Sequence, residues 1–382
     1  MLEYTANANP AMSEVPVRIF PAALHKSGPT RVVPLDLSDA LQLDYPATAP
    51  NLLASFLRID ESDNLETGVT HATSQSFYVI RGSGYSDTRA GRVEWQAGDL
   101  FVLPYLGDSS PSVCVDDHGL NQCVRHHCNA EPTHGGCALY YVHDEPLLRY
   151  LGARPVDTRR FQPALYPGAT MIETVHGITR LDETGAVRNR RGILLSSPDS
   201  PQTKTLTPTL WSLLNSIDAG ANQAPHRHNS VALDLAVSSG GEGGGEVYTL
   251  LGRGLHANGS IVEPLKVVWE SGGVFVTPPG WWHSHHNEAT DTAWVLPMQD
   301  AGLYTHQRTL DIRFQAEEAA RLKEGWNRGA TQGATAATTP SGSSGAETDA
   351  ESPASTELGG AAGASDFVEP LVVGTLMFGH LA

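Results

Sequence analysis

Three histidines in the second half of the chain have the spacing expected of a metal site. His226 and His228 are two residues apart, and His283 follows a Pro-Pro-Gly turn at 278–280. On a β-strand His226 and His228 would point to the same face, because successive side chains alternate between faces. Three neutral imidazoles suit iron, manganese, nickel or zinc, and they leave coordination positions open for substrate or oxygen. The sequence therefore predicts a metal centre at His226, His228 and His283.

The stretches around these histidines resemble the two signature motifs of the cupin superfamily. The first motif is Gly, five residues, His-x-His, which is the spacing of Gly220, His226 and His228. The second is Gly, five residues, Pro-x-Gly-x-x-His, three residues, Asn, and the run 272–287 is similar to it. The resemblance implies an all-β fold of two tandem cupin barrels, each a jelly-roll or double-stranded β-helix. The glutamate that usually follows the first motif is absent, so the implied site has three histidines and no carboxylate.

Composition excludes several classes of protein. The chain has 382 residues, enough for two domains, and its 25 basic against 42 acidic residues give a formal charge of −17. This acidity argues against a nucleic acid or an anionic membrane as partner. No apolar run reaches the roughly 18 residues that a membrane-spanning helix needs. The N-terminus has neither the basic nor the apolar region of a signal peptide, so we expect a cytoplasmic protein.

The first half of the chain also has the texture of a barrel. Residues 51–152 contain short apolar runs separated by glycine turns, as in β-sandwiches and barrels. Gly98 to Pro104 repeats the Gly-x5-Pro of the second cupin motif. Val69 and His71 stand where the two histidines of the first motif would be, and no histidine after Pro104 is in register with His283. The resemblance therefore implies a first barrel without an intact metal site.

The remaining segments complete the expected organisation. A run with a proline near its start, 145–151, predicts a short helix. The stretch rich in Gly, Ala, Ser and Thr at 329–365 cannot bury a core and is expected to be a disordered linker. The other segments are an N-terminal arm at 1–50, a connector at 153–190, the metal-binding barrel at 191–315, a helix at 316–328 and an apolar C-terminal segment at 366–382.

All four cysteines lie in a histidine-containing insert at 108–137. Cys114, Cys123, Cys128 and Cys137 are spaced Cys-x8-Cys-x4-Cys-x8-Cys, which differs from the close cysteine pairs of common zinc modules. Three interpretations stay open: reduced thiols in a loop, a second metal site, or disulfides. Nothing in the sequence implies an oxidising compartment, which disulfides would need.

The second half permits a narrower comparison. It rests on Arg190-Arg191, 209–211, 224–228, Ala232-Leu233 and 282–285. Through these residues the second half is similar to gentisate 1,2-dioxygenase and to the related salicylate and 1-hydroxy-2-naphthoate dioxygenases. The resemblance implies iron(II) held by three histidines, cleavage of a hydroxylated aromatic ring with O2, and a homo-oligomer, dimer or tetramer. In that family the metal barrel comes first, whereas here it comes second.

The same resemblance suggests further site residues. His285 would be a catalytic residue that orients superoxide or takes the phenolic proton of the substrate. Arg190 or Arg191 would pair with a substrate carboxylate and Trp211 would pack on its ring; the alternatives are a solvated basic pair and ordinary barrel core. Asp234 stands where the family has an arginine that grips the carboxylate. An aspartate would repel an anionic substrate unless it is protonated or paired, which favours a less anionic ring.

The sequence thus predicts a non-heme iron(II) dioxygenase that acts on a small hydroxylated aromatic compound. Two other classes stay open. One is a different metal-dependent cupin enzyme, such as a quercetin- or diketone-type dioxygenase, an isomerase or a decarboxylase. The other is a bicupin without enzymatic activity. Metal identity and oxygen consumption distinguish these classes.

Overall fold

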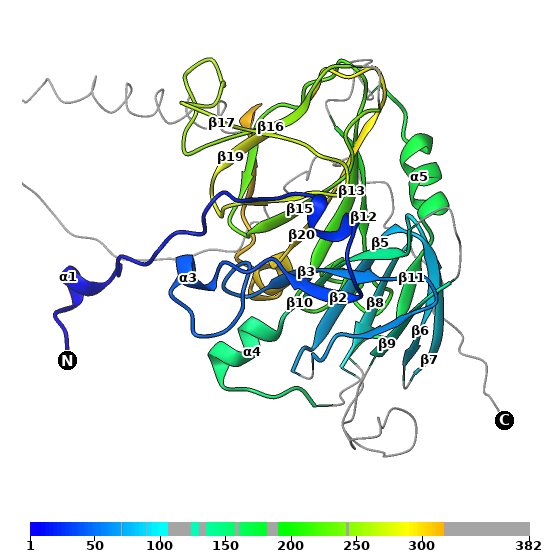
Figure 1. Ribbon diagram of the computed structural model, residues 1–382. Coiled ribbons are helices and arrows are strands. Elements are labelled where there is room, and N and C mark those ends of the chain that lie inside the picture. The colour runs from blue at the N-terminus through cyan, green and yellow to red at the C-terminus, as the bar shows by residue number, and fades with distance from the viewer. Residues whose placement is uncertain are drawn as a thin grey trace, which may run out of the picture.

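The computed structural model describes residues 1–69, 71–88, 90–105, 124–129, 135–156, 160–181, 190–241 and 244–316. Its strands form four antiparallel sheets, two in each of two barrels (Figure 1). This confirms the predicted all-β, two-barrel architecture. The predicted linker and C-terminal segment, and all but the first residue of the predicted helix at 316–328, lie outside the described residues, as do Cys114 and Cys123.

The first barrel is drawn in blue to green in Figure 1. Its larger sheet has the strand order β11-β8-β5-β10-β3-β2, and its smaller sheet has the order β4-β9-β6-β7. The strands are β2 (Arg31–Pro34), β3 (Leu53–Ile59), β4 (Asn64–Glu66), β5 (Ser74–Arg81), β6 (Ser83–Thr88), β7 (Gly91–Gln96), β8 (Leu100–Pro104), β9 (Val124–Cys128), β10 (Cys137–His143) and β11 (Ala164–Tyr166).

The second barrel repeats this arrangement. Its larger sheet has the order β1-β18-β15-β20-β13-β12, and its smaller sheet has the order β17-β16-β19-β14-β21. The strands are β1 (Ile19–Phe20), β12 (Arg191–Leu195), β13 (Trp211–Ile217), β14 (His226–His228), β15 (Ala232–Ser238), β16 (Val247–Gly252), β17 (Leu265–Val268), β18 (Val274–Thr277), β19 (Trp282–Asn287), β20 (Ala293–Gln299) and β21 (Ile312–Phe314).

Helices are short and lie between the strands. The expected helix over 145–151 is confirmed, with Pro146 in its first turn and the left-handed Gly152 at its end. Within the described residues no helix is long and apolar enough to cross a membrane. The helices are α1 (Tyr4–Asn7), α2 (Ala23–Lys26), α3 (Ser38–Leu41), α4 (Glu145–Leu151), α5 (Gly168–Gly177) and α6 (Ala301–Gln307).

The N-terminal arm and the connector each contribute a strand to one of the barrels. In the N-terminal arm, Ile19 of β1 pairs with Phe275 of the second barrel. In the connector, Leu165 of β11 pairs with Phe101 of the first barrel. The arm and the connector are therefore parts of the two barrels rather than separate segments.

One hydrophobic cluster joins the two larger sheets. It contains Phe56 and Tyr140 from the first barrel together with Leu233 and Leu296 from the second. The hydroxyl of Tyr140 donates a hydrogen bond to the backbone oxygen of Leu233 at 3.1 Å. Removing these apolar side chains from water stabilises the pair of barrels as one unit, at about 25 cal/mol for each Å² buried.

Two buried aspartates connect the barrels in a reciprocal way. Asp144, before α4, accepts a hydrogen bond from Thr209 Oγ1 of the second barrel at 2.9 Å. Asp300, before α6, accepts one from Asn51 Nδ2 of the first barrel at 2.8 Å. Burial raises the pKa of Asp300 to about 6 and raises that of Asp144 as well. The two halves thus contact each other through equivalent polar groups.

Candidate metal centre

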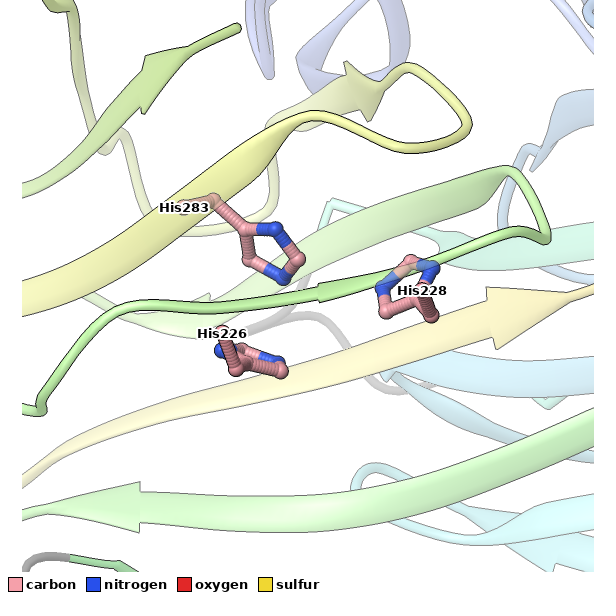
Figure 2. A group of neighbouring side chains, drawn as sticks. All are labelled: His226, His228 and His283. Atoms are coloured by element: carbon pink, nitrogen blue, oxygen red, sulfur yellow. The ribbon is translucent and has the colours of Figure 1, made fainter. Parts of the chain in front are cut away.

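The three predicted histidines meet inside the second barrel. His226 and His228 lie on β14, and His226 is opposite His283 of β19 in the strand ladder. Their candidate ligand atoms all lie within 4.8 Å of one another. Figure 2 shows the three rings gathered between the two strands. Among the described residues no other group of three or more His, Cys, Asp or Glu could hold a metal ion.

Two of the rings are oriented by backbone carbonyls. His228 Nδ1 is 2.9 Å from the oxygen of Ser230, and His283 Nδ1 is 3.1 Å from the oxygen of Trp281. A carbonyl only accepts, so each Nδ1 carries the hydrogen and each Nε2 is left for a metal. Burial lowers the pKa of His228 to about 4 and keeps that of His283 well below its usual range. Both imidazoles are therefore neutral near pH 7, as metal ligation requires.

The Pro-Pro-Gly turn connects the two motifs. Gly280 has a φ of +78°, a left-handed conformation that glycine adopts without strain. Its N–H donates to the backbone oxygen of His228 at 2.7 Å. This hydrogen bond holds the turn against β14, so that His283, the second residue of β19, lies next to the other two ligands.

Arg190 brings a positive charge into the site. Its Nη2 is 3.1 Å from His226 Nδ1 and 3.3 Å from the oxygen of Ala224, while its guanidinium carbon is 5.5 Å from the centre of the Phe314 ring. Its Nε is buried and has no hydrogen-bond partner among the described residues. Burial lowers the pKa of Arg190 to about 10, which still leaves it charged near neutral pH. A buried cation with an unused donor is suited to an anionic ligand group.

Arg191 lies elsewhere, although the sequence could not separate it from Arg190. It forms an ion pair with Asp218. Its neighbour two residues on, Ile193, belongs to the cluster between the barrels, and side chains two apart on a strand share a face. Of the two arginines, Arg190 is the one beside the histidines.

Trp211 and Asp234 lie on strands of the second barrel. Trp211 begins β13 and is partly buried, whereas Asp234 on β15 is fully buried. The Thr277 hydroxyl donates to Asp234 Oδ2 at 2.6 Å, and burial raises the pKa of Asp234 to about 7. The expected repulsion between Asp234 and an anionic substrate is therefore reduced, because a large fraction of this carboxyl group is neutral at physiological pH. Contact of either residue with substrate stays a prediction.

His285 lies beside the metal ligands. Its ring centroid is 5.9 Å from that of His283 and 6.3 Å from that of His226. Its Nδ1 is 2.8 Å from Thr249 Oγ1. Burial, with a smaller contribution from Arg190, lowers the pKa of His285 to about 3. The position of His285 agrees with the predicted role, and the ring is neutral.

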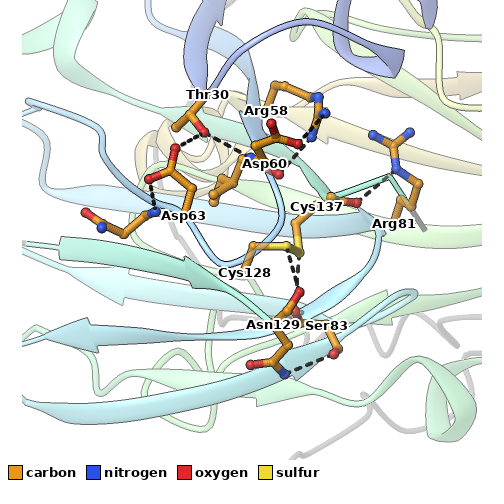
Figure 3. Close-up of a disulfide and its surroundings, with 12 residues drawn as sticks. Thr30, Arg58, Asp60, Asp63, Arg81, Ser83, Cys128, Asn129 and Cys137 are labelled. Carbon is orange, nitrogen blue, oxygen red and sulfur yellow. Dashed lines mark hydrogen bonds and ion pairs between the residues drawn. A yellow bond between two sulfur atoms is a disulfide. The ribbon is translucent and has the colours of Figure 1, made fainter. Parts of the chain in front are cut away.

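Of the three interpretations left open for the cysteine insert, the structure shows a disulfide for two of the four cysteines. Cys128, the last residue of β9, and Cys137, the first of β10, form a disulfide with Cα atoms 5.8 Å apart (Figure 3). Neither is a reduced thiol, so neither can ligate a metal as a thiolate. Disulfides persist mainly in oxidising compartments, so this bond does not favour the expected cytoplasmic location.

The predicted insert at 108–137 includes a strand of the first barrel. Residues 124–128 form this strand, β9. The sequence did not predict this strand because Arg125, His126 and His127 are polar. Of its three buried positions, only two carry apolar side chains. His71, by contrast, lines a surface hollow together with Tyr45 and Arg149.

Sequence reasoning missed three residues around the site. Phe314 on β21 stacks near His226, with ring centroids 5.9 Å apart. Thr249 and Trp269 form a hydrogen-bonded chain to His285. Only the pairing of β16 with β19 brings Thr249 opposite His285, and no local motif shows that pairing.

Comparison with known proteins shows the fold. No protein-family model and no curated protein matches the chain. A salicylate 1,2-dioxygenase from Pseudaminobacter salicylatoxidans is similar in structure, with a TM-score of 0.58 and 14% identity over 83% of this chain and 92% of that one. A mutant of that enzyme in complex with gentisate has a TM-score of 0.58 and 12% identity over 82% and 91%. The chain therefore has the bicupin fold.

Proposed function

We propose that this protein is a non-heme iron(II) dioxygenase that cleaves the ring of a hydroxylated aromatic compound of the gentisate or salicylate type. The observation that carries the proposal is the buried His226, His228 and His283 group with the charged Arg190 beside it. Its support from other proteins is the shared fold with salicylate 1,2-dioxygenase.

The donor set fits the metal. Three neutral imidazoles with two Nδ1 atoms held by carbonyls are a common way to present Nε2 to iron(II), and manganese, nickel and zinc are alternatives. When bound, the metal would supply a place where the substrate and O2 are activated side by side. Phe314 lies beside His226 at this place, with its own side chain exposed.

Arg190 is the group that binds the anionic end of the substrate. Its guanidinium has an unused buried N–H, and a carboxylate or phenolate would satisfy this donor and neutralise the charge. Asp234, with its raised pKa, would accept or donate a hydrogen bond elsewhere on the ring without a full negative charge. A ring with one anionic group and one or more hydroxyl or amino groups fits this pair.

The test is oxygen uptake by iron-loaded protein against hydroxybenzoates, aminophenols and catechols. Uptake with one of these, and a product heavier than the substrate by both atoms of O2, would support ring cleavage. Arg190→Gln should raise KM mainly for substrates that carry a carboxylate, with Arg191→Gln as the matched control. Iron-loaded protein that consumes no oxygen with any compound would contradict the proposal and favour another cupin reaction.

A further inference from the structure

A chain of three polar side chains ends at His285. The indole Nε1 of Trp269 is 2.8 Å from Thr249 Oγ1, and the same oxygen is 2.8 Å from His285 Nδ1. Trp269, Thr249 and His285 are all buried. Trp269 lies just after β17, Thr249 on β16 and His285 on β19, and these three strands are neighbours in the smaller sheet.

The direction of these hydrogen bonds follows from their chemistry. An indole N–H only donates, so the Thr249 oxygen accepts from Trp269. The Thr249 hydroxyl has one hydrogen, and in the described surroundings His285 Nδ1 is the acceptor that it can reach. The opposite arrangement would leave a buried hydroxyl hydrogen without a partner, at a cost of about 1–3 kcal/mol. His285 Nδ1 is therefore the acceptor, and the ring hydrogen is on Nε2.

We propose that Thr249 and Trp269 are positioning residues that hold His285 with its hydrogen on Nε2, so that His285 donates a hydrogen bond to an oxygen atom of the ligand at the three-histidine site. This inference rests on the proposed function for the identity of that ligand. It separates the two roles that the sequence left open. A ring that carries its hydrogen on Nε2 can orient bound oxygen, but it cannot take the phenolic proton of the substrate at that atom.

The first barrel contains the same chain in a place without the three ligands. Trp95 Nε1 is 2.8 Å from Ser86 Oγ, which is 2.7 Å from His126 Nδ1. Ser86 is opposite His126 in its ladder as Thr249 is opposite His285 in its own. Within the described part of the chain His126 Nε2 is buried and has no hydrogen-bond partner. In the first barrel the fold therefore orients the His126 ring without supplying an acceptor for its Nε2. In the second barrel we expect a bound ligand to be the acceptor for the corresponding atom of His285.

The test is the ring nitrogen spectrum of ¹⁵N-histidine-labelled protein loaded with Zn²⁺, with His285→Gln to assign the signals. We expect the hydrogen of His285 on Nε2 in the wild type. Thr249→Val keeps the shape and removes the hydroxyl, so both nitrogens should then share the hydrogen. Thr249→Ser should retain the wild-type pattern. A hydrogen on Nδ1 in the wild type, or a Thr249→Val spectrum equal to the wild type, would overturn the inference.

Turnover provides the second measurement. Thr249→Val should lower kcat by about 10- to 100-fold with KM and metal content unchanged, the scale seen when a group behind a metal site is removed. The matched control is Ser86→Ala, which should shift the His126 signals and leave those of His285 and kcat as they are. Unchanged kcat in Thr249→Val would overturn the donor role. The spectrum needs no substrate, so a failure of the dioxygenase proposal alone would leave the nitrogen result intact.

Discussion

The two barrels share a scaffold and differ in what fills it. The Ser86–His126 and Thr249–His285 pairs occupy the same register, and on the outer face Tyr85 stacks on His127 as Tyr248 stacks on His286. Two residues before His285 is the ligand His283, whereas two residues before His126 is Val124. In the first barrel a valine on β9 therefore stands at the position that corresponds to the ligand His283 on β19.

The interiors differ as much as the ligands. In the first barrel Phe77 stacks on Tyr141 and Phe101, with ring centroids 4.4 Å and 4.8 Å away. Phe77 is opposite Phe101 in its ladder as Asp234 is opposite Phe275 in the other. Aromatic rings therefore fill the interior of the first barrel, whereas the corresponding position of the second barrel holds a carboxyl group. We expect the first barrel to contribute stability and the second to contribute the metal site.

The largest expected effect comes from making the second barrel resemble the first. His283→Val should abolish turnover, because two imidazoles do not hold the metal against loss to water. The matched control is Val124→His, which should create no second site, since Phe77 and Tyr141 occupy the interior. Oxygen uptake by both variants checks this, and residual turnover in His283→Val above about 1% would contradict it.

Emptying the first barrel should cost stability rather than activity. Phe77→Ala removes a fully buried ring between two others, which typically lowers the free energy of unfolding by about 3–5 kcal/mol. Denaturant unfolding followed by fluorescence measures the loss. The metal content of the folded variant should equal that of the wild type. A loss of metal with little loss of stability would break the division of roles between the barrels.

Asp234 should make stability depend on pH. Its pKa is raised to about 7 in the folded protein, so the folded state holds the proton more tightly than the unfolded chain. Its stabilising contribution is complete below its unfolded pKa and is lost as pH rises through about 7. Asp234→Asn removes this loss. Between about pH 5 and about pH 8 the free energy of unfolding of the variant should therefore rise relative to that of the wild type, by at most a few kcal/mol.

Denaturant midpoints at the two pH values measure this gain. The control is Glu61→Gln, which removes an exposed carboxyl and should show no such trend. If the Asp234→Asn variant instead becomes less stable relative to the wild type as pH rises, Asp234 is ionised and paired in the folded protein.

The smallest of these effects concerns the disulfide. Replacing Cys128 and Cys137 with serine together opens a loop of sequence separation 9, which should lower the free energy of unfolding by about 2–3 kcal/mol. The bond joins β9 to β10 of the first barrel, so metal content and turnover should stay unchanged. Loss of a metal ion from the double variant would point instead to a cysteine metal site.

Motif spacing predicted the fold and the three ligands because both are local. The glycines, the Pro-Pro-Gly turn and the histidine pair determine turns and strand faces within a few residues. The run at 145–151 corresponds to α4 for the same reason.

What could not be predicted depends on contacts distant in sequence. Arg190 and Arg191 are neighbours in the chain, and only the pairing of β12 with β13 directs Arg191 to Asp218. Thr249 and Trp269 reach His285 across three strands. The disulfide could not be predicted because it depends on the distance between the end of β9 and the start of β10. The dimeric or tetrameric state stays a prediction, to be measured by light scattering.

The most direct test of the central claim is metal content per chain in the wild type, His226→Ala and His126→Ala. We predict about one ion per chain in the wild type and in His126→Ala, and almost none in His226→Ala, because among the described residues three convergent imidazoles occur only in the second barrel. Iron as the bound ion would also agree with the proposed chemistry. Equal metal content in His226→Ala, or loss of metal from His126→Ala, would contradict the assignment of the metal to the second barrel.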